Sequence, residues 1–299
     1  MIRMVLMVLR RAIILYAVLF LIYQALIDRA TTQAKLLNAH LPAFDDLIAC
    51  MNTPSSCKAQ QWEPYVDYYR AVLHSVKDVG APNGILGVCL FNLGKPQEAI
   101  AHFEKARAYN PKYFWFSYDL GIVYAKTGNY AKAMEYLQQA LGCEPQASLI
   151  YITLSKTLKT LLPVALEQGY IPDQNLHQGI EEATRLLIAS YYRLRQYDQG
   201  AMLALKGMAT ATQQKDFYLY YAGLCAFELK DFMKAVYFFQ ECLKINPDHA
   251  DATDRLAQTL KASGQETVLV GVLEERARAL RRSGWKQPPL EEALTPKIF

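Results

Sequence analysis

The chain has 299 residues, of which 52% are hydrophobic and 20% are charged. This composition excludes an intrinsically disordered protein, because the chain has enough apolar surface to bury a core. The formal net charge of +4 comes from 32 basic and 28 acidic residues spread along the sequence. The clustered basic tract of a nucleic-acid-binding protein is therefore missing, and no nucleic-acid partner is expected.

The N-terminal region contains a run that is apolar enough to enter a membrane. The run from Ala12 to Ile27 has sixteen residues and is interrupted only by Gln24. As a helix it would be roughly 24 Å long, somewhat short of a hydrocarbon core of about 30 Å. The preceding Arg10 and Arg11 can keep their charges at the interface while their stems lie in the apolar zone. We predict that residues 12–27 cross a lipid bilayer once.

Basic residues on the N-terminal side of this run set its expected orientation. Arg3, Arg10 and Arg11 outweigh the basic residues directly after it, where Asp28 also offsets Arg29. The positive-inside rule then places residues 1–29 as a cytoplasmic stub and anchor, with the rest of the chain across the membrane. A cleaved signal peptide is the alternative, but small residues are missing directly after Ile27. The expected location is a bacterial inner membrane, with the folded part in the periplasm.

Two cysteines lie close together before the first clear repeat. Cys50 and Cys57 flank the turn-like sequence Met-Asn-Thr-Pro-Ser-Ser, which would close a small disulfide loop in an oxidising compartment and stay open in a reducing one. Residues 30–49 and 62–78 both have helical patterns, so residues 30–79 are expected to form a helical N-terminal cap around this loop. The other four cysteines fall within helical patterns and are interpreted as buried apolar residues.

An internal period of 34 residues dominates the rest of the chain. It relates five pairs of identical residues: Gly87 and Gly121, Gly94 and Gly128, Ala99 and Ala133, Ala106 and Ala140, and Pro111 and Pro145. Three periods after the second unit, the same register recurs as Gly223, Ala235 and Pro247. Such a fixed period is typical of repeat proteins, in which each unit buries its apolar face against its neighbours.

These residues resemble the tetratricopeptide repeat, a helix-turn-helix unit with Gly, Ala, aromatic residues and Pro at fixed positions. The resemblance implies an all-α, TPR-like helical solenoid of about four to six helix pairs, one of them degenerate, preceded by the transmembrane helix. Residues 80–147 hold two clear units, and residues 216–283 hold one unit followed by capping helices. Residues 148–215 fit poorly and are expected to contain degenerate units with a loop near 168–176.

The last segment, residues 284–299, is expected to be an extended tail. Its Pro288, Pro289 and Pro296 disfavour a helix. A disordered end is favoured here over a docking motif, because chain termini are commonly poorly ordered.

The sequence contains no pattern that predicts chemistry. Its five histidines are scattered singly, and zinc, haem, phosphate-loop, dinucleotide and nucleophile-elbow motifs are all missing. Isolated carboxylates such as Glu104 and Glu135 are interpreted as solvated helix faces. We therefore expect no enzyme activity, no catalytic residues, no metal and no cofactor.

The resemblance also implies where partner proteins bind, because the first helix of each such unit lines the concave face of the solenoid. The positions carried over form an apolar, aromatic groove: Phe91, Trp115, Tyr118, Ile122, Phe217, Tyr220, Leu224 and Phe227. Aromatic residues are favoured anchors at protein interfaces. The alternative is that individual members pack between neighbouring helices. The Lys and Asn carboxylate clamp of chaperone-binding relatives is not present, which disfavours that role.

The leading functional hypothesis is a scaffold or assembly factor that binds subunits of a membrane or envelope complex through this groove. Two alternatives stay open. One is an accessory subunit of a membrane enzyme or envelope complex, and the other is a membrane-bound preprotein receptor or co-chaperone with a cytosolic solenoid.

Overall fold

The computed structural model describes residues 50, 57–75, 80–143, 176–211, 214–265, 268–285, 294 and 296–297. The predicted membrane segment at 12–27 and the predicted helix at 30–49 lie outside these residues, as does most of the predicted loop near 168–176. None of the helices within the described ranges has the length and apolar character needed to cross a membrane.

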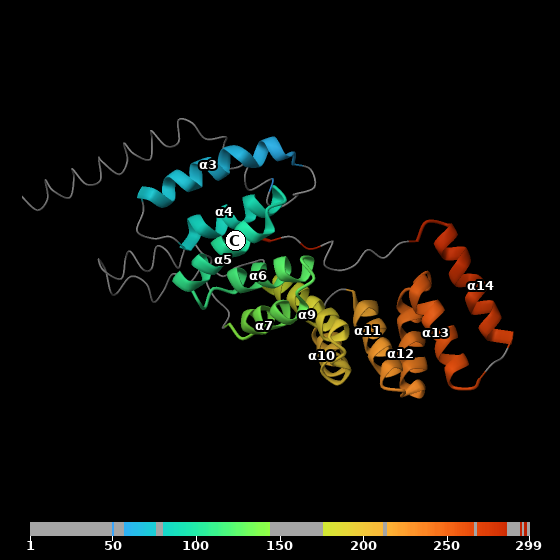
Figure 1. Ribbon diagram of the computed structural model, residues 1–299. Coiled ribbons are helices and arrows are strands. Elements are labelled where there is room, and N and C mark those ends of the chain that lie inside the picture. The colour runs from blue at the N-terminus through green and yellow to red at the C-terminus, as the bar shows by residue number, and fades with distance from the viewer. Residues whose placement is uncertain are drawn as a thin grey trace, which may run out of the picture.

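The described residues form eleven helices and no strands (Figure 1). The first is α3 (Ala59–Ser75), which packs on α4. Ten further helices form five successive helix-turn-helix pairs: α4 (Gly80–Asn92) with α5 (Pro96–Tyr109), α6 (Phe114–Lys126) with α7 (Tyr130–Leu141), α9 (Leu176–Arg193) with α10 (Tyr197–Thr210), α11 (Lys215–Glu228) with α12 (Phe232–Ile245), and α13 (Ala250–Ala262) with α14 (Val268–Arg282). This architecture confirms the predicted all-helical solenoid.

A glycine in the first helix of three pairs lets the two helices of that pair approach closely. A Cβ atom built on Gly87 would lie 2.7 Å from the ring of Phe103, and one on Gly223 would lie 2.7 Å from the ring of Phe239. At Gly121 the same atom would lie 2.6 Å from Leu137. Ordinary carbon contacts are about 3.5–4.0 Å, so only glycine fits. The 34-residue spacing of these glycines therefore reflects one packing contact repeated along the solenoid.

The turn inside each pair has a left-handed residue at one fixed position. Gly94 and Gly128 have φ angles of +73° and +80° there, and Gly264 has +76°. The amide of the following residue bonds a carbonyl five positions back, as in Lys95 N–H to Leu90 O at 2.9 Å. This is the Schellman ending that favours glycine. Arg195 and Lys230 occupy the same turn position with φ angles of 59° and 64°.

Helix α9 is the first helix of the pair that follows α6–α7. It packs on both of those helices and also on α11. It begins at Leu176, the last position of the predicted loop near 168–176. Helices α9 and α10 run from Leu176 to Thr210, within the residues 148–215 that were expected to contain degenerate units.

Substitution of Gly223 by alanine tests the close approach of paired helices. Phe239 is fully buried and has no room to retreat, so Gly223→Ala should lower the free energy of unfolding by about 1–3 kcal/mol through overpacking. Urea unfolding followed by circular dichroism measures the change. Gly271→Ala is the matched control, because Gly271 lies within α14 with no heavy atom of a neighbour within 4 Å of its Cβ position. That control should stabilise the fold by about 0.5–1 kcal/mol, and equal effects of the two changes would contradict the packing argument.

Substitution of Arg195 by glycine tests the left-handed turn. We expect Arg195→Gly to raise the free energy of unfolding by about 0.5–1 kcal/mol, because it relieves a backbone conformation that side chains disfavour. The reverse change, Gly128→Ala, should lower the free energy of unfolding by about 1 kcal/mol through strain alone, since its Cβ would meet no atom within 4 Å. A shift of the same sign in both variants would sink this interpretation.

Candidate functional site

The eight residues predicted to line the groove do not form one surface in the structure. Phe91, Trp115, Tyr118 and Ile122 belong to a cluster in the first half of the solenoid, whereas Tyr220, Leu224 and Phe227 belong to a cluster in the second half and Phe217 to a third. Five of them are buried, namely Trp115, Tyr118, Ile122, Phe217 and Leu224, and the other three are partly exposed. Their contact with a partner stays a prediction.

Packing against α9 buries the two largest of these residues in the first half. A Cβ atom on Gly179 of α9 would lie 2.6 Å from the ring of Trp115, so that ring lies directly on the helix backbone. The hydroxyl of Tyr118 donates a hydrogen bond to Glu182 Oε2 of the same helix. The rings of Trp115 and Tyr118 also meet edge to face, with centroids 5.1 Å apart. This is the packing between neighbouring helices that was the alternative to a direct partner contact.

Three residues of the C-terminal tail lie on this part of the solenoid. Leu294 is 5% exposed and belongs to the same apolar cluster as Trp115 and Tyr118, and Pro296 is also buried. The amide of Lys297 donates a 2.7 Å hydrogen bond to Asp119 Oδ1, and its ammonium contacts both oxygens of Glu182 at 3.0 and 2.8 Å. Leu294 and Lys297 thus lie against the packed helices that include α6 and α9, near the end marked C in Figure 1. This differs from the disordered end expected from its sequence.

The two carboxyl groups that hold the tail differ in their electrostatics. Burial raises the pKa of Asp119 well above its ordinary value, although the amide and charge of Lys297 oppose that shift. Burial also acts to raise the pKa of Glu182, but hydrogen bonds from Lys297 and Tyr118 bring it below its ordinary value. Gln178 Nε2 donates a further hydrogen bond of 2.8 Å to Glu182. With Lys297 bound, Glu182 is therefore the charged carboxylate of an ion pair, and Asp119 accepts a main-chain donor.

We use the name acidic groove for the site formed by Tyr118, Asp119, Gln178 and Glu182 on α6 and α9. Tyr118 was predicted to line an apolar, aromatic groove, and in the structure it lies beside two carboxyl groups. Neither was identified as a binding residue from the sequence. The available signal was Asp119, a single acidic residue in the otherwise apolar and aromatic helix Phe114–Lys126. Glu182 carries no such signal, because it lies among polar residues at the start of α9.

The second half of the solenoid has a separate hollow, lined by Tyr220, Asp251, Asp254, Arg255, Gln258 and Arg281. Arg281 bonds Asp251 and Asp254 at 2.9 and 3.1 Å, so its charge is already neutralised within the chain. The ring of Tyr220 lies 4.7 Å from that of the buried His249, whose pKa burial lowers. The hollow is therefore lined by side chains of α13 and α14 that pair with each other, whereas Glu182 of the acidic groove pairs with a residue of the tail.

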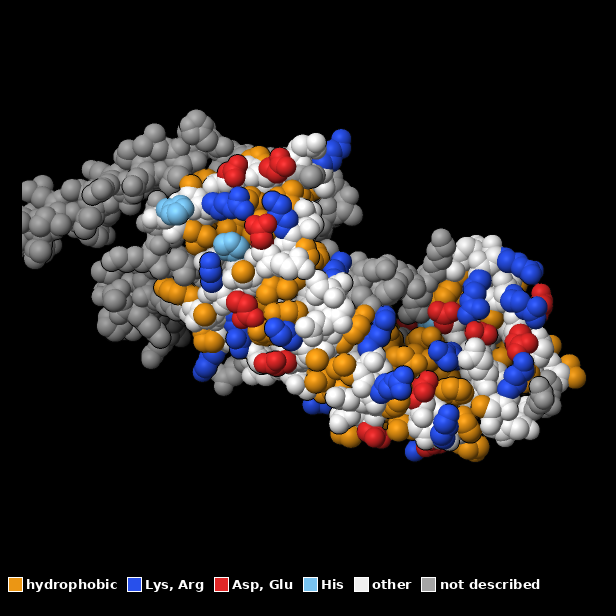
Figure 2. Space-filling model, viewed as in Figure 1, with side chains coloured by type: hydrophobic (Ala, Val, Ile, Leu, Met, Phe, Trp, Pro, Cys, Tyr) orange, Lys and Arg blue, Asp and Glu red, His pale blue; other side chains and the backbone are white. Residues whose placement is uncertain are grey.

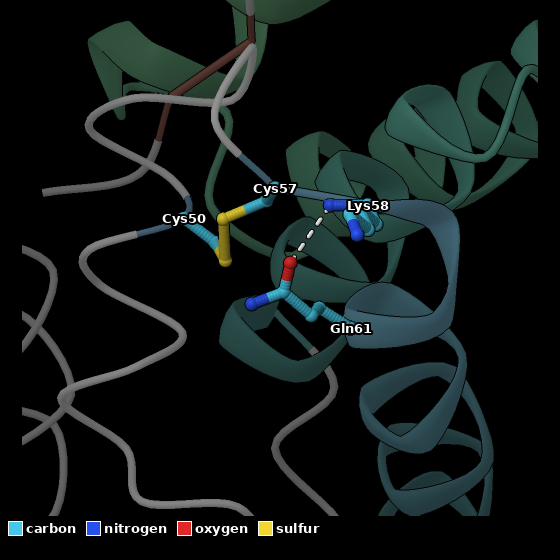
Figure 3. The surroundings of a disulfide bond; sticks show 4 residues. All are labelled: Cys50, Cys57, Lys58 and Gln61. Atoms are coloured by element: carbon cyan, nitrogen blue, oxygen red, sulfur yellow. Dashed lines mark hydrogen bonds between the residues drawn. A yellow bond between two sulfur atoms is a disulfide. The ribbon is translucent and has the colours of Figure 1, made fainter.

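A disulfide joins Cys50 and Cys57 directly before α3, with Cα atoms 5.6 Å apart (Figure 3). In the same region Lys58 N–H donates to Gln61 Oε1 at 2.8 Å, which satisfies a free amide at the start of α3. Trp62 and Tyr65 of that helix are buried in the first-half cluster. The cysteine pair thus closes its loop beside the cap that covers α4.

The described residues give little sign of a metal site or a reactive thiol. Within the described ranges no group of three or more His, Cys, Asp or Glu residues is placed to hold a metal ion. The free thiols of Cys89, Cys225 and Cys242 are buried, and burial raises the pKa of each to about 12. These thiols are therefore protonated packing residues and poor nucleophiles.

Comparison with known proteins gives the repeat type. Models of the tetratricopeptide repeat match residues 90–156 and residues 218–249. The chain is 30% identical over 163 residues to tetratricopeptide repeat protein 21B of Mus musculus, covering 54% of this chain and 12% of that protein. It is 28% identical over 120 residues to the BBSome complex member BBS4 of Bos taurus, covering 38% of this chain and 21% of that protein. The chain thus spans a small part of each of these relatives.

Solved structures give the same fold. YrrB, described as a TPR protein with an unusual peptide-binding site, superposes with a TM-score of 0.53 at 13% identity, covering 72% of this chain and 93% of that one. MamA from Desulfovibrio magneticus RS-1 superposes with a TM-score of 0.52 at 15% identity, covering 70% of this chain and 99% of that one. At these identities the likeness shows the fold alone. Together with the two matched segments, it shows that this chain contains tetratricopeptide repeats built into an all-helical solenoid.

Proposed function

We propose that this chain is a non-enzymatic assembly factor, tethered to a bacterial inner membrane, which holds partner proteins in the groove of its periplasmic solenoid. The observation that carries the proposal is the tail in the acidic groove, where main-chain, ionic and apolar contacts already hold a non-helical segment. A surface that binds such a segment of its own chain has the chemistry to bind one from another protein.

Two of the predicted partner-binding residues lie outside the acidic groove and remain partly exposed. Phe91 on α4 and Phe227 on α11 are half-buried, and each has a lysine ammonium over its ring, at 5.4 and 5.8 Å. A partner would bury these rings at little conformational cost. Trp115 and Tyr118 would act as the rigid floor beneath the bound segment rather than as its direct anchors.

Two features support the membrane and the compartment. The apolar run at 12–27, preceded by Arg10 and Arg11, has the composition of a single-pass anchor. The Cys50–Cys57 disulfide is of a kind that persists in oxidising compartments such as the periplasm and is rare in the cytosol. It therefore favours an exported solenoid over the alternative of a cytosolic preprotein receptor. An anchor would also raise the local concentration of whatever the solenoid holds.

Affinity capture tests the groove. We expect a chain tagged at its N-terminus and extracted in mild detergent to retain a defined set of envelope proteins, measured by quantitative mass spectrometry. Phe91→Ala/Phe227→Ala should lose that set. The control is Met233→Ala/Tyr237→Ala, which removes side chains that are 79% and 57% exposed on α12. Loss in the control but not in the groove variant would move the interface to α12, and an absence of specific partners in every sample would reject a stable scaffold. A partner retained in equal stoichiometry with an enzyme would identify an accessory subunit.

Thiol labelling in intact spheroplasts tests the compartment. A maleimide that cannot cross membranes should label Cys50 and Cys57 only after a membrane-impermeant reductant has opened their disulfide. The Cys50→Ser/Cys57→Ser variant is the control and should lose this reductant-dependent signal. Labelling that requires lysis of the inner membrane would place the solenoid in the cytosol and contradict the proposal.

A further inference from the structure

We infer that the acidic groove between α6 and α9 recognises a non-helical peptide segment with an apolar residue followed three positions later by a lysine, and that the chain's own tail occupies it until a partner displaces the tail. The inference rests on the proposed function and adds to it the chemistry of the ligand and a means of regulation. It is carried by the juxtaposition of Leu294 and Lys297 with Tyr118, Asp119 and Glu182.

The first step concerns the lysine. Its ammonium lies within 3.0 Å of both oxygens of Glu182, and the side chains of Lys297 and Glu182 are only 20% and 7% exposed. A carboxylate so well shielded from water is costly unless a cation accompanies it. Tyr118 and Gln178 supply only neutral donors to Glu182. Of the described side chains that hydrogen-bond Glu182, Lys297 is the one that carries a positive charge, so the bound segment supplies a basic side chain at that position.

The second step concerns the main chain. Asp119 is completely buried on α6, and its Oδ1 accepts the amide of Lys297 at 2.7 Å. Its other oxygen, Oδ2, has no hydrogen-bond partner among the described residues. A buried polar atom without a partner is rare in folded proteins. The groove therefore retains one polar atom without a partner among the described residues, which a segment with a further polar group near its lysine would satisfy better than the tail does.

The third step concerns the apolar position and the backbone. Leu294 is buried in the cluster that contains Trp115 and Tyr118, three positions before the lysine. Pro296 is buried beside the lysine, and its ring holds φ near −65° and disfavours helix in the preceding residue. The segment that fits thus begins with an apolar residue and ends, three positions later, with a lysine that donates through both its amide and its ammonium. Of the two positions between them, the second suits proline.

Because the tail is part of the same chain, it competes with a partner at a local concentration that is millimolar for short flexible connections. A partner with the same four-residue pattern would bind poorly while the tail is seated, and more tightly once the tail is weakened. The tail thus acts as an intramolecular competitor, and a partner binds only if its concentration and affinity are high enough to displace the tail.

A labelled peptide tests this competition directly. The probe is a fluorescein-labelled peptide with the sequence of residues 288–299, titrated against the full chain in mild detergent and followed by fluorescence anisotropy. Leu294→Ala/Lys297→Ala in the chain frees the groove, so we expect the probe to bind this variant at least about tenfold more tightly than it binds the wild type. Circular dichroism establishes that both proteins are equally helical.

A second set of variants tests the chemistry of recognition. Adding Glu182→Gln to the tail variant should weaken probe binding at least about tenfold, because the bound ammonium loses its counter-charge. The matched control is Glu181→Gln, one position away on α9, where the carboxylate instead faces His177 at 3.4 Å; this change should leave binding within about twofold. A probe with alanine in place of its lysine should bind weakly to every variant.

Three results would overturn the inference. The first is equal binding of the probe to the wild type and to the tail variant, and the second is probe binding that does not change with Glu182→Gln. The third is a wild-type dimer, seen by sedimentation, that dissociates in the tail variant. Such a dimer would place the tail in the groove of a second copy. Failure of the probe while captured envelope proteins still depend on Phe91 and Phe227 would reject this ligand and keep the scaffold function. Loss of both would reject the two together.

Discussion

The close contact between a glycine on one helix and a large side chain on its partner is the constraint on which this solenoid depends. Gly87, Gly121 and Gly223 each allow a ring or a leucine to lie on the helix backbone itself. The contact fixes the distance between paired helices and so the angle at which the next pair stacks. Gly179 extends the same device between units, because it brings Trp115 onto α9 and thereby places Tyr118 beside Glu182. The position of the acidic groove is thus a consequence of how tightly the helices pack.

The groove joins two kinds of surface that are usually separate. Its floor is aromatic and dry, which strengthens every electrostatic contact above it, and its two carboxyl groups are nearly inaccessible to water. Elsewhere the exterior of the described residues carries interspersed basic and acidic side chains, as Figure 2 shows for one face of the molecule. Exposed ion pairs of that sort contribute little to stability or to recognition. A buried carboxylate paired with the lysine of the tail is a different case, since the loss of either partner leaves an uncompensated charge.

The regular parts of the molecule could be predicted from the sequence, because local spacing encodes them. Identical residues 34 positions apart predict the units at 80–147 and 216–283, and Pro111 and Pro247 follow directly after the ends of α5 and α12. The placement of α9 against α6 could not be predicted, because the repeat pattern is weak between them. The docking of Lys297 onto Asp119 joins residues 178 positions apart, and a lone tail lysine has no periodicity to reveal its partner. Local pattern thus predicts the units, and long-range contacts decide which carboxyl groups become a site.

The docked tail also links the last helix pair of the solenoid to its first half. Only eight residues separate Trp285, just after the end of α14, from Leu294 in the first-half cluster, and the nine Cα–Cα steps between them span at most roughly 30 Å. While the tail is seated, it therefore acts as an inextensible strap between the last helix pair and the second. Repeat solenoids are otherwise springs, whose pitch changes by small rotations between neighbouring units. The docked tail limits how far the solenoid can extend. A force that stretches the solenoid therefore favours release of the tail, and a ligand that displaces the tail allows the solenoid to extend further.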